Sequence, residues 1–183
     1  MQGFSTSLRH ARPLAVALCL ALLLPAGVQA AVDEPELKAA IVFNLLLFVE
    51  WPPEREPTAT QSLVLCLRSG SELFAPLERL SQRPIRNARL DLRALLPEGD
   101  VRPCHALFSD GPDGERSALA RRIGRSTGAI VIADETAQPS DVTSIQLRRL
   151  DSRIGFDVSM AALRHAGVQV SSKLLRLAKA IRE

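Results

Sequence analysis

Few side chains in this chain are of the types that carry out catalysis. Beyond residue 30 it holds two histidines, His105 and His165, two cysteines, Cys66 and Cys104, and no tyrosine. Cys104 and His105 are adjacent, so on an extended strand their side chains point to opposite faces and cannot chelate one ion or pair as nucleophile and base. A zinc site needs three or four ligands at workable spacing. The sequence therefore predicts no metal site.

Two glycines and a pair of carboxylates follow predicted strands, where ligands often bind. Gly70 and Gly111 each come after an apolar run, as in a phosphate-binding turn, but no Gly-x-Gly-x-x-Gly motif or P-loop lysine accompanies them. The adjacent carboxylates Asp134 and Glu135 would take part in acid–base chemistry only inside a cleft. We interpret both glycines as residues of ordinary strand-to-helix turns.

A hydrolase with Ser71 or Cys104 as its nucleophile is one alternative, and it requires a base within hydrogen-bond reach of either side chain. No other reactive arrangement stands out along the chain. We therefore predict a protein that is not an enzyme, with no catalytic residue and no cofactor. An exported domain of this kind is typical of a binding or regulatory module.

The N-terminus has the pattern of a secretory signal. A basic segment with Arg9 and Arg12 precedes an apolar run over 14–24, and small residues lead up to Ala30. The apolar run is about half of the ~20 residues that span a bilayer. We predict a signal peptide over 1–30 that is cleaved after Ala30, which places the mature protein in the periplasm with no membrane span.

The remaining residues, 31–183, are enough for a single domain. Of the 23 Lys and Arg residues two lie in 1–30, where there is no Asp or Glu, so 21 basic side chains remain against 20 acidic ones. Nucleic-acid binding needs a concentrated basic face. This balanced composition excludes that class of function.

Cys19 leaves with the signal peptide, so Cys66 and Cys104 are an even pair in an oxidising compartment. Such a pair favours a disulfide over two separate buried thiols. Cys66 lies near the end of one predicted strand and Cys104 before another. The bridge therefore joins a strand to a loop, or the second strand begins earlier than its apolar run.

The middle of the chain alternates between strand and helix patterns. Short apolar runs without alternation, typical of parallel strands buried on both faces, occupy 63–67, 106–108 and 129–133, with a weaker strand at 88–92. Helical stretches at 71–80 and 115–123 lie between them. This order predicts a three-layer α/β domain with a mostly parallel sheet flanked by helices.

The last third predicts a C-terminal antiparallel hairpin. Apolar and polar residues alternate over 145–147 and again over 154–158, on either side of a turn at 149–152. Alternation is typical of strands with one buried and one solvated face. We expect this hairpin to have one wet face.

Further helices have recognisable ends. The segment 35–49 is predicted to be a helix that is apolar nearly all round, so it must be covered on several sides by the core or by a partner. Ser159 can cap a helix that Gly167 ends, and Ser171 or Ser172 can cap a final one.

Two stretches resemble the YfiR family of periplasmic regulators. The sequence KAAIVFNLLLFVEWP over 38–52 is similar to the family's opening helix. RIGFDV over 153–158, followed by GVQVSSKLLRLA over 167–178, is similar to its strand, helix and closing Ser-Ser-Lys-Leu-Leu signature. Cys66 and Cys104 stand between these stretches, as the family's disulfide pair would. The resemblance covers essentially the whole mature chain.

This resemblance implies a periplasmic binding protein that represses an inner-membrane diguanylate cyclase of the YfiN type. Binding to the cyclase's periplasmic domain would lower cyclic-di-GMP signalling and biofilm output, and a sensor kinase is the alternative partner. We expect partner contacts at Trp51, Phe48, Leu46 and Phe43, and a homodimer if their helix is not fully covered.

A second function stays open beside this one. The chain would be a periplasmic small-molecule-binding module, with its effector docked at the ends of the parallel strands. Open α/β sheets form crevices there.

Overall fold

The computed structural model describes residues 33–96, 98–123, 128–136, 140–151 and 153–183. The predicted signal peptide and its cleavage site lie outside these residues, as does Ser152 of the predicted turn. Residues Asp33 to Glu183 form one compact unit. Within the described part of the chain, no helix is long and apolar enough to cross a bilayer.

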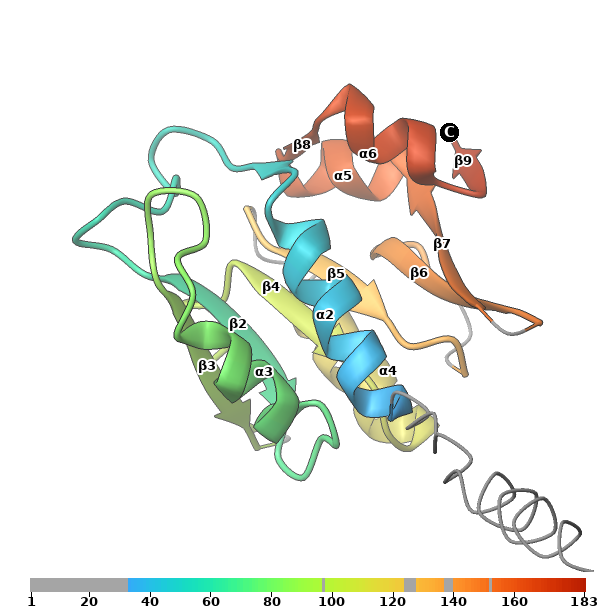
Figure 1. Ribbon diagram of the computed structural model, residues 1–183, viewed down its shortest axis with the longest axis horizontal. Coiled ribbons are helices and arrows are strands. Elements are labelled where there is room, and N and C mark those ends of the chain that lie inside the picture. Colours follow the sequence, from blue (N-terminus) through green and yellow to red (C-terminus); the bar gives the residue numbers. More distant parts are fainter. Residues whose placement is uncertain (1–32, 97, 124–127, 137–139, 152) are drawn as a thin grey trace, which may run out of the picture. The chain divides into compact units, whose positions relative to one another are not determined.

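A seven-stranded sheet forms the centre of the domain, in the order β3-β2-β4-β5-β6-β7-β9 (Figure 1). Its strands are β2 (Leu63–Arg68), β3 (Leu90–Leu95), β4 (Ala106–Ser109), β5 (Ile130–Ala133), β6 (Thr143–Leu150), β7 (Arg153–Ser159) and β9 (Ala180–Arg182). Neighbouring strands are parallel except β6 and β7, which are antiparallel. A separate two-stranded antiparallel sheet pairs β1 (Val49–Glu50) with β8 (Gln169–Val170).

Helices cover both faces of the large sheet, as the predicted three-layer architecture requires (Figure 1). They are α2 (Glu34–Leu46), α3 (Phe74–Ser81), α4 (Asp113–Ile123), α5 (Met160–Ala166) and α6 (Ser172–Leu177). One apolar core joins α2, α3, α5 and α6 to Leu65 and Phe108, and a second joins α4 to Cys66 and Leu107. Successive strand residues thus enter opposite cores. This explains why the predicted apolar runs show no alternation.

The opening helix is shorter than the sequence predicts. It ends at Leu46, and Val49 and Glu50 form a short strand that pairs with Val170 and Gln169. The prolines at 52 and 53 disfavour helical conformation in the residues that precede them. The backbone of Val49 and Glu50 finds its hydrogen-bond partners in the C-terminal part of the chain instead.

The predicted hairpin forms between β6 and β7, with Leu147 opposite Phe156. The expectation of a wet face is wrong for the first half of β6, because Ser144 is 1% and Gln146 is 0% exposed. Residues 143–147 lie inside the sheet between β5 and β7. The side-chain amide of Gln146 donates to the carbonyl oxygen of Asp134 at 2.6 Å, which satisfies its buried donor.

The predicted helix ends near the C-terminus are confirmed. The hydroxyl of Ser159 accepts a hydrogen bond from the Ala162 amide at 3.3 Å, and Gly167 ends α5 with a φ of 69°. The hydroxyl of Ser171 accepts from the Leu174 amide and caps α6. These caps fix where the chain turns back to form β8 and β9.

The strand order reverses between β2 and β4. From β2 the chain passes through α3 to β3 on one side, and from β4 it passes through α4 to β5 on the other. Because α3 and α4 lie on opposite faces, the loops that follow β2 and β4 diverge from each other at the carboxyl edge of the sheet.

Candidate functional site

Most of the predicted partner-binding residues lie inside the protein. Trp51, Leu46 and Phe43 are 5%, 0% and 3% exposed and belong to the larger core. Phe48 is half-buried and is packed against that core from outside. A partner can therefore touch Phe48 directly, whereas the other three support the helix from within.

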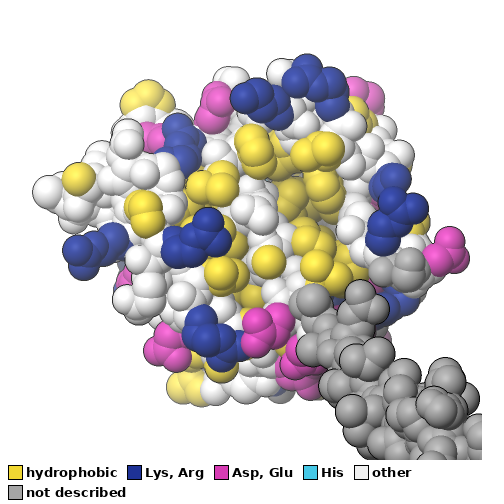
Figure 2. Space-filling model, viewed as in Figure 1, with side chains coloured by type: hydrophobic (Ala, Val, Ile, Leu, Met, Phe, Trp, Pro, Cys, Tyr) yellow, Lys and Arg dark blue, Asp and Glu magenta, His cyan; other side chains and the backbone are white. Residues whose placement is uncertain are grey.

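The solvent side of α2 carries a different set of apolar residues. Counting along the helix and into the turn after it, the apolar residues at outward positions are Leu37, Ala40, Ile41, Leu47 and Phe48, all half-buried or exposed, with the exposed polar residue Asn44 among them. We call these five apolar residues the α2 outer stripe. Figure 2 shows hydrophobic side chains gathered on this face, with Lys and Arg side chains around them.

The sequence signalled this stripe through the composition of the helix rather than through any motif. A helix that is apolar nearly all round must be covered on several sides. The core covers the side that includes Val42 and Leu46, both 0% exposed. The α2 outer stripe lies on the side of the helix that the core does not cover.

A group of charged side chains fixes the first turns of α2. The ammonium of Lys38 lies 3.0 Å from Glu34, 3.0 Å from Asp134 and 3.4 Å from Glu135. Arg149 on β6 contacts Glu34 at 2.6 Å and Glu135 at 2.5 Å. The predicted carboxylate pair at the end of β5 therefore anchors a buried lysine. Sequence reasoning missed Lys38, because its partners come from separate parts of the chain.

These ion pairs shift the pKa values of Glu34 and Lys38. Arg149, followed by Lys38, lowers the pKa of the Glu34 carboxyl to about 2. Burial opposes the charge of Lys38, but its hydrogen bonds with Asp134 and Glu34 outweigh that effect and raise the pKa of the ammonium to about 12. Glu34 and Lys38 are therefore charged at neutral pH, and the contact of Lys38 with Asp134 holds α2 to the end of β5.

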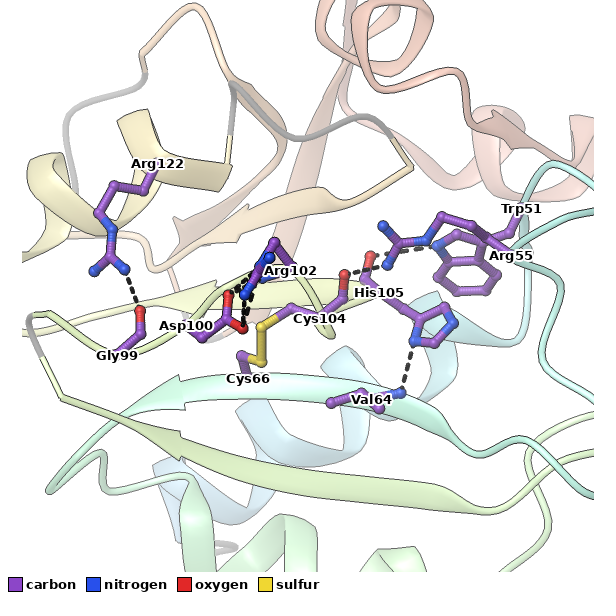
Figure 3. Close-up of a disulfide and its surroundings, with 10 residues drawn as sticks. All are labelled: Trp51, Arg55, Val64, Cys66, Gly99, Asp100, Arg102, Cys104, His105 and Arg122. Atoms are coloured by element: carbon purple, nitrogen blue, oxygen red, sulfur yellow. Dashed lines mark hydrogen bonds and ion pairs between the residues drawn. A yellow bond between two sulfur atoms is a disulfide. The ribbon is translucent and has the colours of Figure 1, made fainter.

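Cys66 and Cys104 form a disulfide, as predicted, with their Cα atoms 5.7 Å apart (Figure 3). Cys66 lies within β2, where its register partner on β4 is Leu107. Cys104 lies two residues before β4, so the bridge joins a strand to a loop. Both cysteines are 0% exposed and belong to the core beneath α4.

The residues next to the disulfide tie the segment after α2 to the start of β4 (Figure 3). The guanidinium of Arg55 donates to the carbonyl oxygen of Cys104 at 2.6 Å. The indole of Trp51 donates to the carbonyl oxygen of His105 at 3.3 Å and meets the His105 ring edge to face. Trp51 is thus a structural residue of this end of the sheet.

Cys104 and His105 lie in the loop before β4 and not on a strand, and their side chains have separate partners, Cys66 for Cys104 and Trp51 for His105. The Nδ1 atom of His105 accepts a hydrogen bond from the Val64 amide at 3.0 Å. Burial, together with the charge of Arg55, lowers the pKa of the His105 imidazole to about 4. The ring is therefore neutral at physiological pH and acts as a fixed acceptor for the backbone of β2.

The nucleophiles of the hydrolase alternative have structural partners. Cys104 has no thiol because it is part of the disulfide. Ser71 does have a base within hydrogen-bond reach, because its hydroxyl donates to the carboxylate of Asp110 at 2.6 Å, but Ser71 is only 6% exposed and its hydroxyl also accepts from the Leu73 amide. Among the described residues, no group of three or more His, Cys, Asp or Glu side chains is arranged to hold a metal ion.

Comparison with known proteins identifies one family. A family described as YfiR/HmsC-like matches residues 35–179, which is nearly the whole of the domain from α2 to the start of β9. No curated protein matches the chain. The matched family is a regulatory one, and its members are periplasmic.

Proposed function

The chain belongs to the YfiR/HmsC-like family, and from this we propose that it is a periplasmic repressor of an inner-membrane diguanylate cyclase. It binds the cyclase's periplasmic domain and so lowers cyclic-di-GMP production. The observation that carries this proposal is the family match over residues 35–179. Export follows the predicted route, with cleavage of the signal peptide after Ala30.

We assign the α2 outer stripe as the surface that meets the cyclase. Leu37 is 37% exposed, and Ile41 and Phe48 are partly exposed although each is a large apolar side chain. Aromatic and aliphatic side chains of this kind form the centres of protein interfaces. The ion pairs of Lys38 hold the helix in place, so the stripe reaches the partner without first being ordered.

Repression requires only a difference in affinity. A regulator that binds the inactive conformation of the cyclase more tightly than the active one shifts the population toward the inactive one. A tenfold shift corresponds to about 1.4 kcal/mol of differential binding. Burial of one or two large apolar side chains supplies this amount, at about 1.5–3 kcal/mol for each fully buried side chain.

The test is the cyclic-di-GMP content of the native host after deletion of the gene. We expect the content to rise on deletion and to return to the starting level when the wild-type gene is restored. Restoration with Ile41→Glu should fail, because a carboxylate in the centre of the stripe cannot be buried without a partner. Leu96→Glu is the matched control, since Leu96 is 66% exposed and lies outside the stripe, just after β3.

Two further measurements distinguish a variant that is poorly folded or poorly exported from one that has lost its partner. Immunoblots of the periplasmic fraction must show equal amounts of the two variants. Crosslinking in cells should recover the cyclase with wild type and Leu96→Glu, but not with Ile41→Glu. An unchanged cyclic-di-GMP level on deletion, or recovery of a sensor kinase in place of a cyclase, contradicts the assignment of a cyclase as the partner.

A further inference from the structure

A cleft of about 540 Å³ lies at the carboxyl edge of the large sheet, where the strand order reverses. It is bounded by the first turns of α2, by the loops that follow β2 and β4, and by the end of β5. In open α/β sheets the loops on either side of such a reversal separate, and ligands bind in the crevice between them. The volume falls within the range of small-molecule sites.

Two glycines keep the loops open on either side of the cleft. Gly70 follows β2 with a φ of 84°, and Gly111 follows β4 with a φ of 85°. A Cβ atom at Gly111 would collide with the side chain of Arg68, which lies across the loop. Both glycines line the cleft, so their backbone conformation sets its shape.

Negative charge predominates in the lining. Among the described residues of the lining five are acidic, namely Asp33, Glu34, Glu72, Asp110 and Asp134, and two are basic, Lys38 and Arg68. The two basic groups already face carboxylates of the protein. Lys38 is paired with Glu34 and Asp134, and the Arg68 Nε atom lies 3.7 Å from Asp110. Asp33 and Glu72 are exposed. The surplus of charge that meets an incoming molecule is therefore negative.

Asp110 lines the cleft, and one of its two carboxylate oxygens has no hydrogen-bond donor in the described part of the chain. Its side chain is 12% exposed, and its Oδ2 atom accepts from Ser71. Its Oδ1 atom is buried and has no hydrogen-bond donor among the described residues, since 3.7 Å from Arg68 Nε is too long. Burial raises the pKa of the Asp110 carboxyl, so an additional cation near it would favour its charged form.

Apolar side chains complete the wall. Pro35, Leu73 and Phe108 line the cleft beside the charged groups. A ligand that fits both the apolar side chains and the excess of carboxylates has an aliphatic or aromatic body and a cationic head. We propose that this cleft binds a small organic amine, with its ammonium group placed among Asp110, Glu72 and Asp33 and its hydrocarbon part against Leu73 and Phe108.

The test uses the product of the full-length gene and three probes that share a four-carbon skeleton. Putrescine carries two ammonium groups, 1,4-butanediol carries none, and succinate carries two carboxylates. Titrations are followed by calorimetry and by the backbone amide signals in NMR spectra, all at one ionic strength. We expect putrescine to bind and to shift the amide signals of Gly70 and Gly111, and the other two probes to do neither.

Single substitutions locate the site and control for general charge effects. Asp110→Asn keeps an acceptor for Ser71 but removes the negative charge, and Glu72→Gln changes an exposed residue at the rim. Asp110→Asn should weaken putrescine binding by about tenfold or more, the usual effect of removing a charged hydrogen-bond partner. Glu72→Gln should weaken it by up to about fivefold, because an exposed charge pair contributes about 1 kcal/mol or less. Glu78→Gln on α3 removes the same charge outside the cleft lining and should leave the affinity unchanged.

Three outcomes overturn the proposal. Equal binding of 1,4-butanediol shows that the ammonium is not recognised, and binding of succinate alone reverses the sign of the site. Equal weakening by Glu78→Gln and Glu72→Gln shows a general counter-ion effect. None of these measurements involves the cyclase, so the amine site and the proposed repressor function can fail separately.

Discussion

The two histidines of the domain show how position decides the chemistry of a residue. His105 is half-buried beside Trp51, accepts a backbone hydrogen bond and has a pKa of about 4 because of burial and Arg55. His165 is exposed near the end of α5. Protonation of His105 would remove its acceptor and place a second positive charge near Arg55, so protonation of this ring opposes folding.

We expect His105 to make the stability of the protein depend on pH between 6.5 and 5. The pKa is about 4 in the folded state, against 6.5 for the unperturbed group. The neutral ring's contribution is therefore complete above pH 6.5 and is lost as the pH falls through 6.5 toward 4. The loss between pH 6.5 and 5 should be about 1 kcal/mol, after allowance for the solvent that reaches the half-buried ring.

Urea unfolding of wild type, His105→Asn and His165→Asn at pH 7 and pH 5 measures this effect. Asparagine at 105 keeps an acceptor for the Val64 amide but does not titrate in this range. We expect His165→Asn to follow the wild type and His105→Asn to lose less stability on acidification. Parallel losses in all three proteins would contradict the role of His105. Glu34 does not confuse the comparison, because its lowered pKa of about 2 confines its effect to pH values below about 4.5.

At the scale of the secondary-structure element, the same substitution should have opposite effects at two glycines. Gly167 ends α5 with a φ of 69° and has open space where a Cβ would lie. Alanine there meets no steric clash but must adopt the left-handed conformation, which costs about 1 kcal/mol. Gly114 lies in the first turn of α4 and also has open space around it.

We therefore expect Gly167→Ala to lower the free energy of unfolding by about 1 kcal/mol. Gly114→Ala should raise it by about 0.5 kcal/mol, because alanine loses less backbone entropy than glycine in a helix. Chemical denaturation of both variants checks this pair of predictions. A stabilising effect at Gly167 would show that the left-handed conformation is not maintained there.

The elements that the sequence predicts are those with strong local patterns. The apolar runs identify β2, β4 and β5, and the serine and glycine caps identify the ends of α5 and the start of α6. The strands β1, β8 and β9 have two or three residues each and depend on partners far along the chain, such as Val170 for Val49. A local pattern contains no information about such pairing.

The candidate sites were also predictable to different degrees, because a local pattern does not show which distant residues come together. The cysteine pair could be identified because its two members are the only cysteines beyond residue 30. The partner-binding residues were chosen by type, and three of the four lie in the core, because Phe43 and Leu46 face inward from α2 and Trp51 packs against His105. The cleft draws its walls from four separate segments, so only the rule for strand ends pointed to it.

At the scale of the whole molecule, the disulfide should contribute a large share of the stability. It closes a loop between residues 38 positions apart. Loop-closure entropy for this length gives about 4 kcal/mol, which corresponds to a fall in Tm on the order of 10 °C for a domain of this size. Calorimetry of Cys66→Ala/Cys104→Ala should show this loss.

Cys19→Ala is the matched control for that measurement, because Cys19 lies in the predicted signal peptide. We expect the exported Cys19→Ala protein to have the Tm of the wild type. A Tm of the double variant within 2–3 °C of the wild type, well below the shift expected on the order of 10 °C, would show that the bridge adds little to a fold that is already constrained.

The burial of the disulfide also restricts the order in which the protein can assemble. Both cysteines are 0% exposed, and Leu119 and Ile123 of α4 pack in the same core. An enzyme or small thiol that exchanges with these sulfurs needs direct access to them. Oxidation must therefore precede the docking of α4 on the sheet. Once α4 has docked, the oxidation state of the pair reflects the conditions under which the chain folded, and later changes in the surrounding thiols reach it only through partial unfolding.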